Sequence, residues 1–400
     1  MPKRADIFLD QSANTGNGLG IGAPTQYLVQ TPTGVLYHVY IDFASDVSFK
    51  KSSDGGLNWS NPTIVYAGTV TGLSIWYDRW SDISAGLIHL AYTHTTSHDT
   101  FYRTINTESS DALSTETTIF AGTSAVAAGS SLSICRARGG NVYCRTCIDA
   151  GAEGGFFRLP NANVPNGAWD AARTINEALA TLDMAILLPG WAADNQDMML
   201  IFWDVSANEI SRQLYDDSAN SWAETSISGS MVDVTPSLGG FPHFSAAVDI
   251  ANSRNILIAW NGVDTANADL LGWTVTESAI TAFTTSVVLN GTDDQGLCAI
   301  TIDLQTGYWW AFYAGKSDGS ETWGTAVNIY YKYSTDSGAT WSAENLLTLA
   351  AYNVFSLHSC PRLYLGSPPV LRGVNVATFN YPQTINIQVA LPTAKYQLGI

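Results

Sequence analysis

Charged residues are scarce in this sequence, and basic residues are the scarcest among them. Only 13% of the 400 residues are Asp, Glu, Lys or Arg, and 18 Lys and Arg stand against 35 Asp and Glu, so the net charge is −17. A surface this negative repels phosphate backbones, which argues against nucleic acid as a partner.

Long apolar runs are also missing. Runs such as residues 185–188 and 198–203 are short, whereas a membrane span needs ~20 apolar residues, so we expect no membrane insertion.

Cysteine is another scarce residue, with five in the chain. An odd number scattered over a long sequence does not describe the disulfide framework of a small secreted domain. Cys144 and Cys147 form a single Cys-x-x-Cys in a strand-like segment, and strand alternation puts them on opposite faces of a sheet. Because a zinc site of this type needs a second pair, we predict reduced thiols and no bound metal.

Cofactor and export signals are absent as well. The sequence has no nucleotide-binding loop, no dinucleotide fingerprint and no metalloprotease helix motif. Asp- and Asn-rich loops at residues 193–197 and 292–295 offer oxygen atoms to Ca²⁺ but do not match the EF-hand spacing. We predict no cofactor, with Ca²⁺ as an alternative that no motif supports. The first six residues lead straight into a strand-like segment without an apolar signal region, so we predict synthesis in the cytoplasm without secretory export.

What the sequence does have is a β pattern along its whole length. Hydrophobic residues make up 46% of it, enough for a large core and too many for a disordered chain. Residues 35–41, 87–92 and 255–260 are short, rich in β-branched and aromatic side chains, and bounded by Gly, Asn, Asp or Ser. The pattern predicts an all-β protein.

One octapeptide occurs twice in identical spacing. Residues 52–59 and 334–341 both read Ser-x-Asp-x-Gly-x-x-Trp, and each follows a strand-like run. In a hairpin turn the Asp carboxylate accepts backbone N–H groups, Gly supplies a positive φ, and Trp covers the loop. The predicted structural residues are therefore Ser52, Asp54, Gly56, Trp59, Ser334, Asp336, Gly338 and Trp341.

Degenerate copies of the octapeptide appear at regular intervals. Positions 59, 116, 169, 222, 283 and 341 mark the Trp position of each copy and lie 53 to 61 residues apart. Such a period, with several strands per unit, is typical of a β-propeller. Dividing 400 residues by seven gives about 57, so we predict one domain, residues 1–400, with seven four-stranded antiparallel blades and with six blades as the alternative. The blades are expected at 20–70, 78–122, 130–178, 182–230, 241–290, 296–350 and 357–392, with the N-terminal strand at 5–10 closing the last.

The octapeptide resembles the Asp-box, or BNR repeat, of the sialidase-like β-propeller superfamily. The resemblance covers essentially the whole chain and implies that the boxes lie at the rim, away from any active site. Sialidases of this fold use three arginines to bind a carboxylate, a Tyr–Glu pair and an acidic residue. The motif of their first arginine is missing here, and no Tyr–Glu pair can be chosen from spacing. The candidate arginines near inner strands are Arg79, Arg136, Arg138 and Arg362.

The resemblance also includes propeller-type polysaccharide lyases, in which His and Tyr transfer protons beside a uronate. Residues 92–103 concentrate side chains suited to such chemistry at neutral pH. The catalytic candidates from this hairpin are His94, His98, Tyr102 and Arg103, and the alternative is a polar loop without chemistry. The candidates for ligand binding are Trp76, Trp80, Trp191, Arg136, Arg138, His243 and His358.

These observations favour a non-catalytic module over an enzyme. We expect a glycan-binding, receptor-binding or structural propeller whose partners are a glycan, a cell-surface receptor or other virion subunits. Few lysines, many small polar residues and no export signal suggest a phage or viral tail, fibre or capsid-decorating protein, deployed on a virion or released by lysis. The alternative is a glycan-processing enzyme, either a sialidase-like glycosidase or a uronate polysaccharide lyase.

Overall fold

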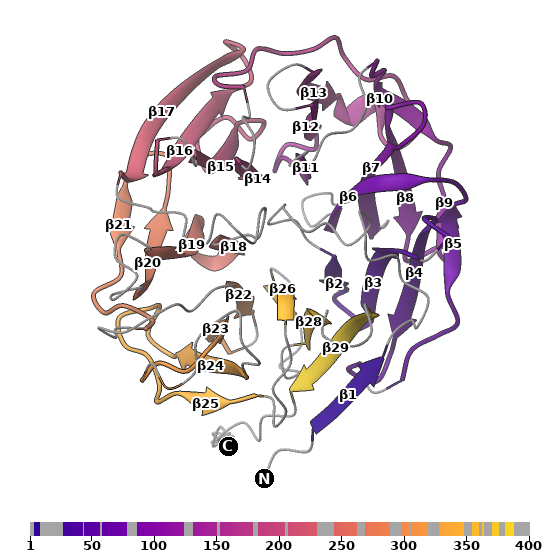
Figure 1. Cartoon of the computed structure of the whole chain (residues 1–400). Coiled ribbons are helices and arrows are strands. Elements are labelled where there is room, and N and C mark those ends of the chain that lie inside the picture. Colours follow the sequence, from indigo (N-terminus) through magenta and orange to yellow (C-terminus); the bar gives the residue numbers. More distant parts are fainter. Residues whose placement is uncertain are drawn as a thin grey trace, which may run out of the picture.

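A ring of small sheets makes up the described part of the molecule (Figure 1). The computed structural model describes residues 4–8, 27–42, 44–56, 58–77, 86–123, 131–149, 153–178, 183–204, 207–229, 244–261, 269–288, 298–304, 306–318, 320, 328–347, 354–359, 362–363, 370–375 and 381–387. Within these residues the helical elements are two short 3₁₀ turns, η1 (Asn161–Asn163) and η3 (Ile250–Asn252). None of the helices described there is long or apolar enough to span a membrane.

Six sheets are each folded from one continuous stretch of chain. From the inner to the outer strand they are β2 (Leu28–Gln30), β3 (Leu36–Ile41), β4 (Val47–Ser52) and β5 (Thr63–Tyr66); β6 (Val70–Tyr77), β7 (Leu87–His94), β8 (Thr100–Asn106) and β10 (Thr117–Phe120), with β9 (Ala112–Leu113) also on β8; β11 (Ser131–Arg136), β12 (Val142–Asp149) and β13 (Glu153–Leu159); β14 (Met184–Pro189), β15 (Met198–Asp204), β16 (Glu209–Asp216) and β17 (Ser221–Ser228); β18 (Phe244–Asp249), β19 (Arg254–Asn261), β20 (Asp269–Val275) and β21 (Ile280–Ala282); and β22 (Cys298–Asp303), β23 (Trp309–Ala314), β24 (Ile329–Ser334) and β25 (Asn345–Leu346).

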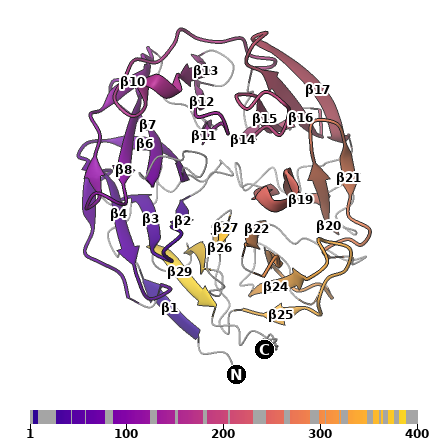
Figure 2. The same cartoon turned by 180° about the vertical axis from the view of Figure 1, so that it is seen from behind.

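The two ends of the chain share one further sheet. Its strands are β26 (Val354–Ser359), β28 (Val370–Asn375), β29 (Tyr381–Ile387) and the N-terminal β1 (Arg4–Phe8), which pairs antiparallel with β29 and places Arg4 opposite Ile387. The short β27 (Arg362–Leu363) pairs parallel with β22. Both views show β1 beside β29 (Figures 1 and 2).

The prediction of an all-β propeller closed by the N-terminal strand is confirmed. Six blades are each folded from a continuous stretch, which is the number given by the alternative prediction. The main prediction of seven holds only when the composite sheet is counted as a blade. The predicted four strands per blade do not hold for every sheet. Among the described residues the third sheet has three strands, and β9 and β27 give the second and sixth sheets a fifth.

The inner strands pack side by side around the ring. Three serines join neighbouring inner strands in the same way, because each accepts a backbone N–H from the next sheet. The pairs are Ile134 N–H to Ser74 Oγ (3.1 Å), Leu187 N–H to Ser133 Oγ (2.9 Å) and Ile300 N–H to Ser245 Oγ (3.1 Å). A buried N–H group left without an acceptor costs about 1–3 kcal/mol, so these serines stabilise the seams between blades.

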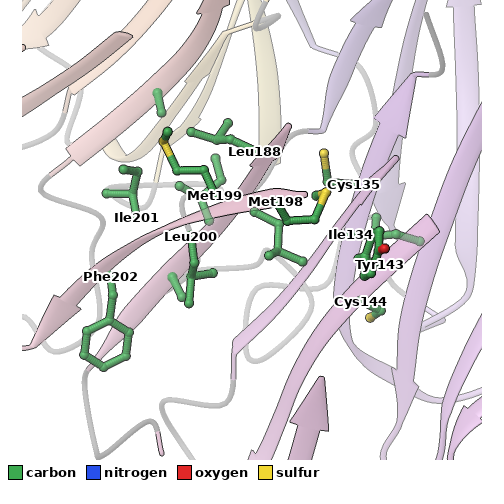
Figure 3. Close-up of a cluster of buried hydrophobic side chains, with 14 of the residues drawn as sticks. Ile134, Cys135, Tyr143, Cys144, Leu188, Met198, Met199, Leu200, Ile201 and Phe202 are labelled. Carbon is green, nitrogen blue, oxygen red and sulfur yellow. The ribbon is translucent and has the colours of Figure 1, made fainter. Parts of the chain in front are cut away.

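The core lies between the sheets. Apolar faces of neighbouring sheets meet in it, as Figure 3 shows for β11 and β12 against β14 and β15, with Cys135 and Tyr143 across from Leu188 and Met198. The described cysteines are Cys135, Cys144, Cys147 and Cys298, all of them buried and unbridged. Their reduced state stays a prediction from the sequence, and burial raises the pKa of the Cys144 thiol.

Strand order sorts the connections onto two faces. Neighbouring strands of each continuous sheet are antiparallel, so the first-to-second and third-to-fourth connections share one face. We call it the box face, because both octapeptides lie there. The second-to-third connections and the links between blades share the opposite face, the entry face, where the inner strands begin.

The first octapeptide forms a closed turn between β4 and β5. Ser52 Oγ donates to Asp54 Oδ1 (2.7 Å) and accepts the Gly56 N–H (2.8 Å). Asp54 Oδ1 accepts the Asn58 N–H at 2.9 Å, and the Trp59 indole N–H donates to the Gly56 carbonyl at 3.1 Å. The carboxylate therefore helps to close its own turn.

The second octapeptide forms the same turn between β24 and β25. Ser334 Oγ donates to Asp336 Oδ1 (2.8 Å) and accepts the Gly338 N–H (2.8 Å). Asp336 Oδ1 accepts the Thr340 N–H at 2.8 Å, which matches the bond in the first copy. Two segments 282 residues apart (334 − 52) thus repeat one turn at the same place in their blades.

Two degenerate copies use their Asp differently. Asp111, in the second blade, accepts hydrogen bonds from the Tyr37 hydroxyl (2.6 Å) and from Lys51, both in the first blade. Asp217, in the fourth blade, binds Arg158 Nη1 and Arg173 Nη2 of the third, each at 2.8 Å. In these copies the carboxylate joins its blade to the preceding one instead of closing its own turn.

Candidate functional site

A cluster of aromatic and titratable side chains lies at the entry face between the first and second blades. Tyr66 ends the outer strand β5, and His94 ends β7. The Tyr66 hydroxyl is 3.5 Å from His94 Nδ1, and the two ring centroids are 4.3 Å apart. Phe101, on β8, also packs against His94, with the two ring centroids 4.3 Å apart. Both Tyr66 and His94 are partly exposed. His94 Nε2 is buried, so Nδ1, which also lies 3.4 Å from Ser97 Oγ, is the nitrogen available to the Tyr66 hydroxyl.

The surroundings keep both rings of this pair uncharged. Burial lowers the pKa of His94 below its ordinary value, while Glu116 and Asp99 act in the opposite direction. Burial raises the pKa of Tyr66, and the charges of Glu116 and Asp46 raise it further. At neutral pH the pair therefore combines a proton acceptor with a protonated phenol, which is the combination needed for general acid–base chemistry.

Comparison with the sixth blade separates the scaffold of this cluster from its chemistry. The Tyr92 hydroxyl donates to Glu116, and the Tyr313 hydroxyl donates to Glu344 from the same positions in its blade. Arg103, the register partner of Leu90 on β8, has Lys332 on β24 as its counterpart. Both serve one purpose, because Arg103 Nη1 donates to the Val65 carbonyl and Lys332 Nζ donates to the Val287 carbonyl. The Tyr–Glu pair and the cation are thus repeated parts of the blade.

His94 and Tyr66 do not recur in that repeated arrangement. Two residues beyond the tyrosine, the second blade has His94 and the sixth has Gly315. Opposite the start of the third strand, the first blade has Tyr66 and the fifth has Val288. The scaffold therefore exists without these two side chains, which marks them as the features peculiar to this seam.

The other candidates from the predicted hairpin lie outside the pair. Tyr102 is fully buried on the opposite face of β8, where its hydroxyl is 2.7 Å from His89 Nδ1. Arg103 donates to the Val65 carbonyl and, from Nε, to the Ser114 carbonyl at 3.1 Å. His98 occupies a left-handed conformation (φ +64°) in the loop after β7. Of the four candidates, only His94 belongs to the cluster with Tyr66.

The arginines Arg136 and Arg138 lie towards the box face and do not form a carboxylate clamp. Arg136 is 1% exposed and donates to the Gly140 carbonyl at 2.8 Å. Arg138 donates to the Gly190 carbonyl at 2.7 Å, and its guanidinium lies 5.3 Å from the Trp191 ring. Both side chains join loops of neighbouring chain segments, which corrects their prediction as ligand-binding residues.

The predicted tryptophan platforms are also accounted for by packing. Trp76 is 1% exposed and belongs to the core, so it has no face for a sugar, which corrects that prediction. Trp191 is partly buried under Arg138, and its indole N–H donates to Asn255 Oδ1 at 3.4 Å. Arg79, Trp80 and His243 lie outside the described residues, while Arg362 and His358 are described by their backbone alone, on β27 and β26.

Tyr66 and Glu116 were missed by sequence reasoning. Tyr66 lies 28 residues before His94 (94 − 66) on another blade, so only the packing of β5 on β7 brings them together. Glu116 was assigned to the Trp position of a degenerate turn. Aligning the blades by strand register, with Tyr92 on Tyr313 and Glu116 on Glu344, is the signal that could have found it.

Comparisons with known proteins give similarity of fold. No family model and no curated protein matches the sequence. Among solved structures, an ulvan lyase bound to -[GlcA(1-4)Rha3S]- superposes with a TM-score of 0.57 over 96% of both chains, at 9% identity. Trypanosoma rangeli sialidase gives a TM-score of 0.44 over 97% of this chain and 60% of its own, at 10% identity. Penicillium chrysogenum alpha-L-arabinanase with arabinobiose gives 0.46 over 97% and 98%, at 10% identity. The ulvan lyase shares the propeller fold of this chain.

Proposed function

We propose that this chain is a glycan-processing propeller in which Tyr66 and His94 transfer protons. The observation that carries the proposal is the 3.5 Å contact between the Tyr66 hydroxyl and His94 Nδ1 at the entry face. Support comes from comparison with the repeated scaffold. The position equivalent to His94 is Gly315 in the sixth blade, and the position equivalent to Tyr66 is Val288 in the fifth blade. The full-length similarity to an ulvan lyase, a polysaccharide lyase, adds a substrate class to test.

The chemistry that the pair suits is β-elimination of a uronate. The neutral imidazole of His94 takes the proton from C5 of the sugar, and the C4–O bond breaks as a C4=C5 double bond forms. The Tyr66 phenol gives its proton to the departing oxygen, and exchange with solvent restores both groups. The carboxylates Asp46, Asp99 and Glu116 act electrostatically on the pair, so their negative charge opposes the binding of a polyanion.

The test is cleavage by matched variants. We expect the full chain to release unsaturated, ultraviolet-absorbing ends from a uronate polysaccharide. His94→Gln removes the proton acceptor and should lower kcat by on the order of 10²–10⁴-fold, and Tyr66→Phe should lower it as well. Tyr308→Phe is the control, because Tyr308 is a partly exposed tyrosine of the sixth blade, before β23. A wild-type rate in His94→Gln would refute this assignment.

A non-catalytic glycan-binding module is the second candidate. It is favoured by the arginines Arg103, Arg136 and Arg138, which donate to backbone carbonyls and leave no clamp for a carboxylate. This candidate predicts selective retention on a glycan array together with no cleavage of any glycan on it. The enzyme is supported if the wild-type chain cleaves a glycan and His94→Gln still binds that glycan but no longer cleaves it.

We also propose that the two octapeptides are Asp-boxes of the sialidase-like superfamily. Their support is the identical turn between third and fourth strands, with Asp54 and Asp336 accepting corresponding backbone N–H groups. The virion assignment and release by lysis stay predictions from composition. Identification of the chain in purified virions by mass spectrometry would test them.

A further inference from the structure

Gly68 lies directly against the ring of Tyr66. A Cβ atom at this position would be 2.7 Å from Tyr66 Cε1 and 2.8 Å from its hydroxyl oxygen. The backbone φ of Gly68 is +152°, in a region that residues with a side chain rarely adopt. Only glycine therefore lets the chain pass this close to the ring and turn towards β6.

Asp46 fixes the backbone of Gly68. Its Oδ1 atom, in the connection between β3 and β4, accepts the Gly68 N–H at 2.7 Å. The next residue but one is held by the same connection, since the Val70 N–H donates to the Ser45 carbonyl at 3.0 Å. Asp46 is itself held, because its N–H donates to Asp42 Oδ1 at 3.0 Å.

The segment between β5 and β6 is also attached to the loop that follows His94. The Thr95 N–H donates to the Thr69 carbonyl at 3.0 Å, and the hydroxyls of Thr69 and Thr96 are 3.3 Å apart. Gly68 and the two residues after it are thus fixed, to the connection between β3 and β4 in the first blade and to the loop that follows His94. The position of Tyr66 over His94 follows from these attachments.

We propose that Asp46 and Gly68 are positioning residues that hold the Tyr66 ring over His94, an inference that rests on the proposed function of this pair. Neither residue touches the reacting atoms of a substrate. Asp46 sets the backbone of Gly68, and Gly68 sets the place of the phenol. Loss of either moves the Tyr66 hydroxyl away from His94 Nδ1 and opens the imidazole to water.

The first experiment measures His94 itself. Its imidazole signal is followed through a pH titration by NMR in the full-length chain and assigned by its absence in His94→Gln. Gly68→Ala and Asp46→Ala should raise the pKa of His94 towards its ordinary value, because water replaces the Tyr66 ring. Asp46→Asn keeps an acceptor oxygen for the Gly68 N–H and should leave the titration as in the wild type.

Gly307→Ala is the matched control. Gly307 also has a positive φ (+74°), but a Cβ there would meet no atom within 4 Å, so the variant adds a methyl group at a positive φ without any ring contact. A His94 titration that is unchanged in both Gly68→Ala and Asp46→Ala overturns the inference. If Gly68→Ala fails to fold, as judged by circular dichroism, Asp46→Ala decides alone.

The second experiment measures turnover in the same variants. A misplaced donor should lower kcat of Gly68→Ala by on the order of 10²-fold with little change in KM, since a shift of ~1 Å has this effect. Shifted titrations in a chain that cleaves no glycan would leave the positioning inference standing and refute the proposed function. Unshifted titrations in a chain that does cleave glycans would refute the positioning inference and leave the proposed function standing.

Discussion

Position 338 requires glycine for two separate reasons. Its φ is +84°, and a Cβ would lie 2.8 Å from the Trp309 ring and 3.3 Å from Phe283. The ring of Trp309 is buried, so it has no room to move aside. The turn and the core beneath it therefore both require glycine at this position of the octapeptide.

This double constraint gives a prediction for stability. Gly338→Ala should lower the free energy of unfolding by about 2 kcal/mol, the range expected for strain at a left-handed position, with additional loss from the ring contact. Chemical denaturation of the two variants measures it, with Gly307→Ala as the strain-only control. Equal midpoints for the two variants would show that the Trp309 contact contributes nothing.

At the scale of strands and turns, much of this architecture can be predicted from the sequence. Short alternating apolar segments predicted β3, β7 and β19, and the octapeptide predicted the turns after β4 and β24. The spacing of its degenerate copies indicated the ring. The sequence could not indicate that Asp111 and Asp217 would leave their own turns, because that depends on cations supplied by the neighbouring blade.

The same seams explain why the site was only partly predictable. His94 was selected because its residue type suits proton transfer, but its partner Tyr66 belongs to the preceding blade. Contacts between blades depend on how two sheets pack, and residue spacing within one blade carries no record of it. Arg136 and Arg138 were misassigned for this reason, since the carbonyls they bind became visible only in the folded loops.

The seam at Asp217 gives a second stability prediction. Asp217→Asn should lower the free energy of unfolding by about 3 kcal/mol, because Arg173 would lose its carboxylate partner and Arg158 would keep only Asp170. Asp318→Asn is the control, since Asp318 pairs with Lys316 at an exposed site where ion pairs contribute little. Denaturation midpoints that fall equally in both variants would rule out a special role for the seam.

At the scale of the whole molecule, closure of the ring and excess negative charge act against each other. The inner strands pack around the centre and β1 joins the last sheet, so the blades are held at short distances (Figure 2). Because the net charge is −17, carboxylates held this close repel one another, which destabilises the folded state. Two partly buried acids show the effect. Burial raises the pKa of Glu177 to about 7, with Asp204 and Glu224 adding to it, and burial raises that of Asp197 to about 6, with Asp194 and Asp216 adding to it.

The sign of the resulting pH dependence follows from linkage. Between about pH 4 and pH 7 the folded chain keeps protons on Asp197 and Glu177 that the unfolded chain has released, so the unfolded state binds fewer protons and stability falls as the pH rises. We expect urea midpoints to decrease from about pH 4.5 to about pH 7.5, and the double variant Asp197→Asn, Glu177→Gln to flatten that decrease. A decrease of the same slope in the double variant would assign the effect to other carboxylates. A rise in stability across this range would contradict the raised pKa values of Asp197 and Glu177.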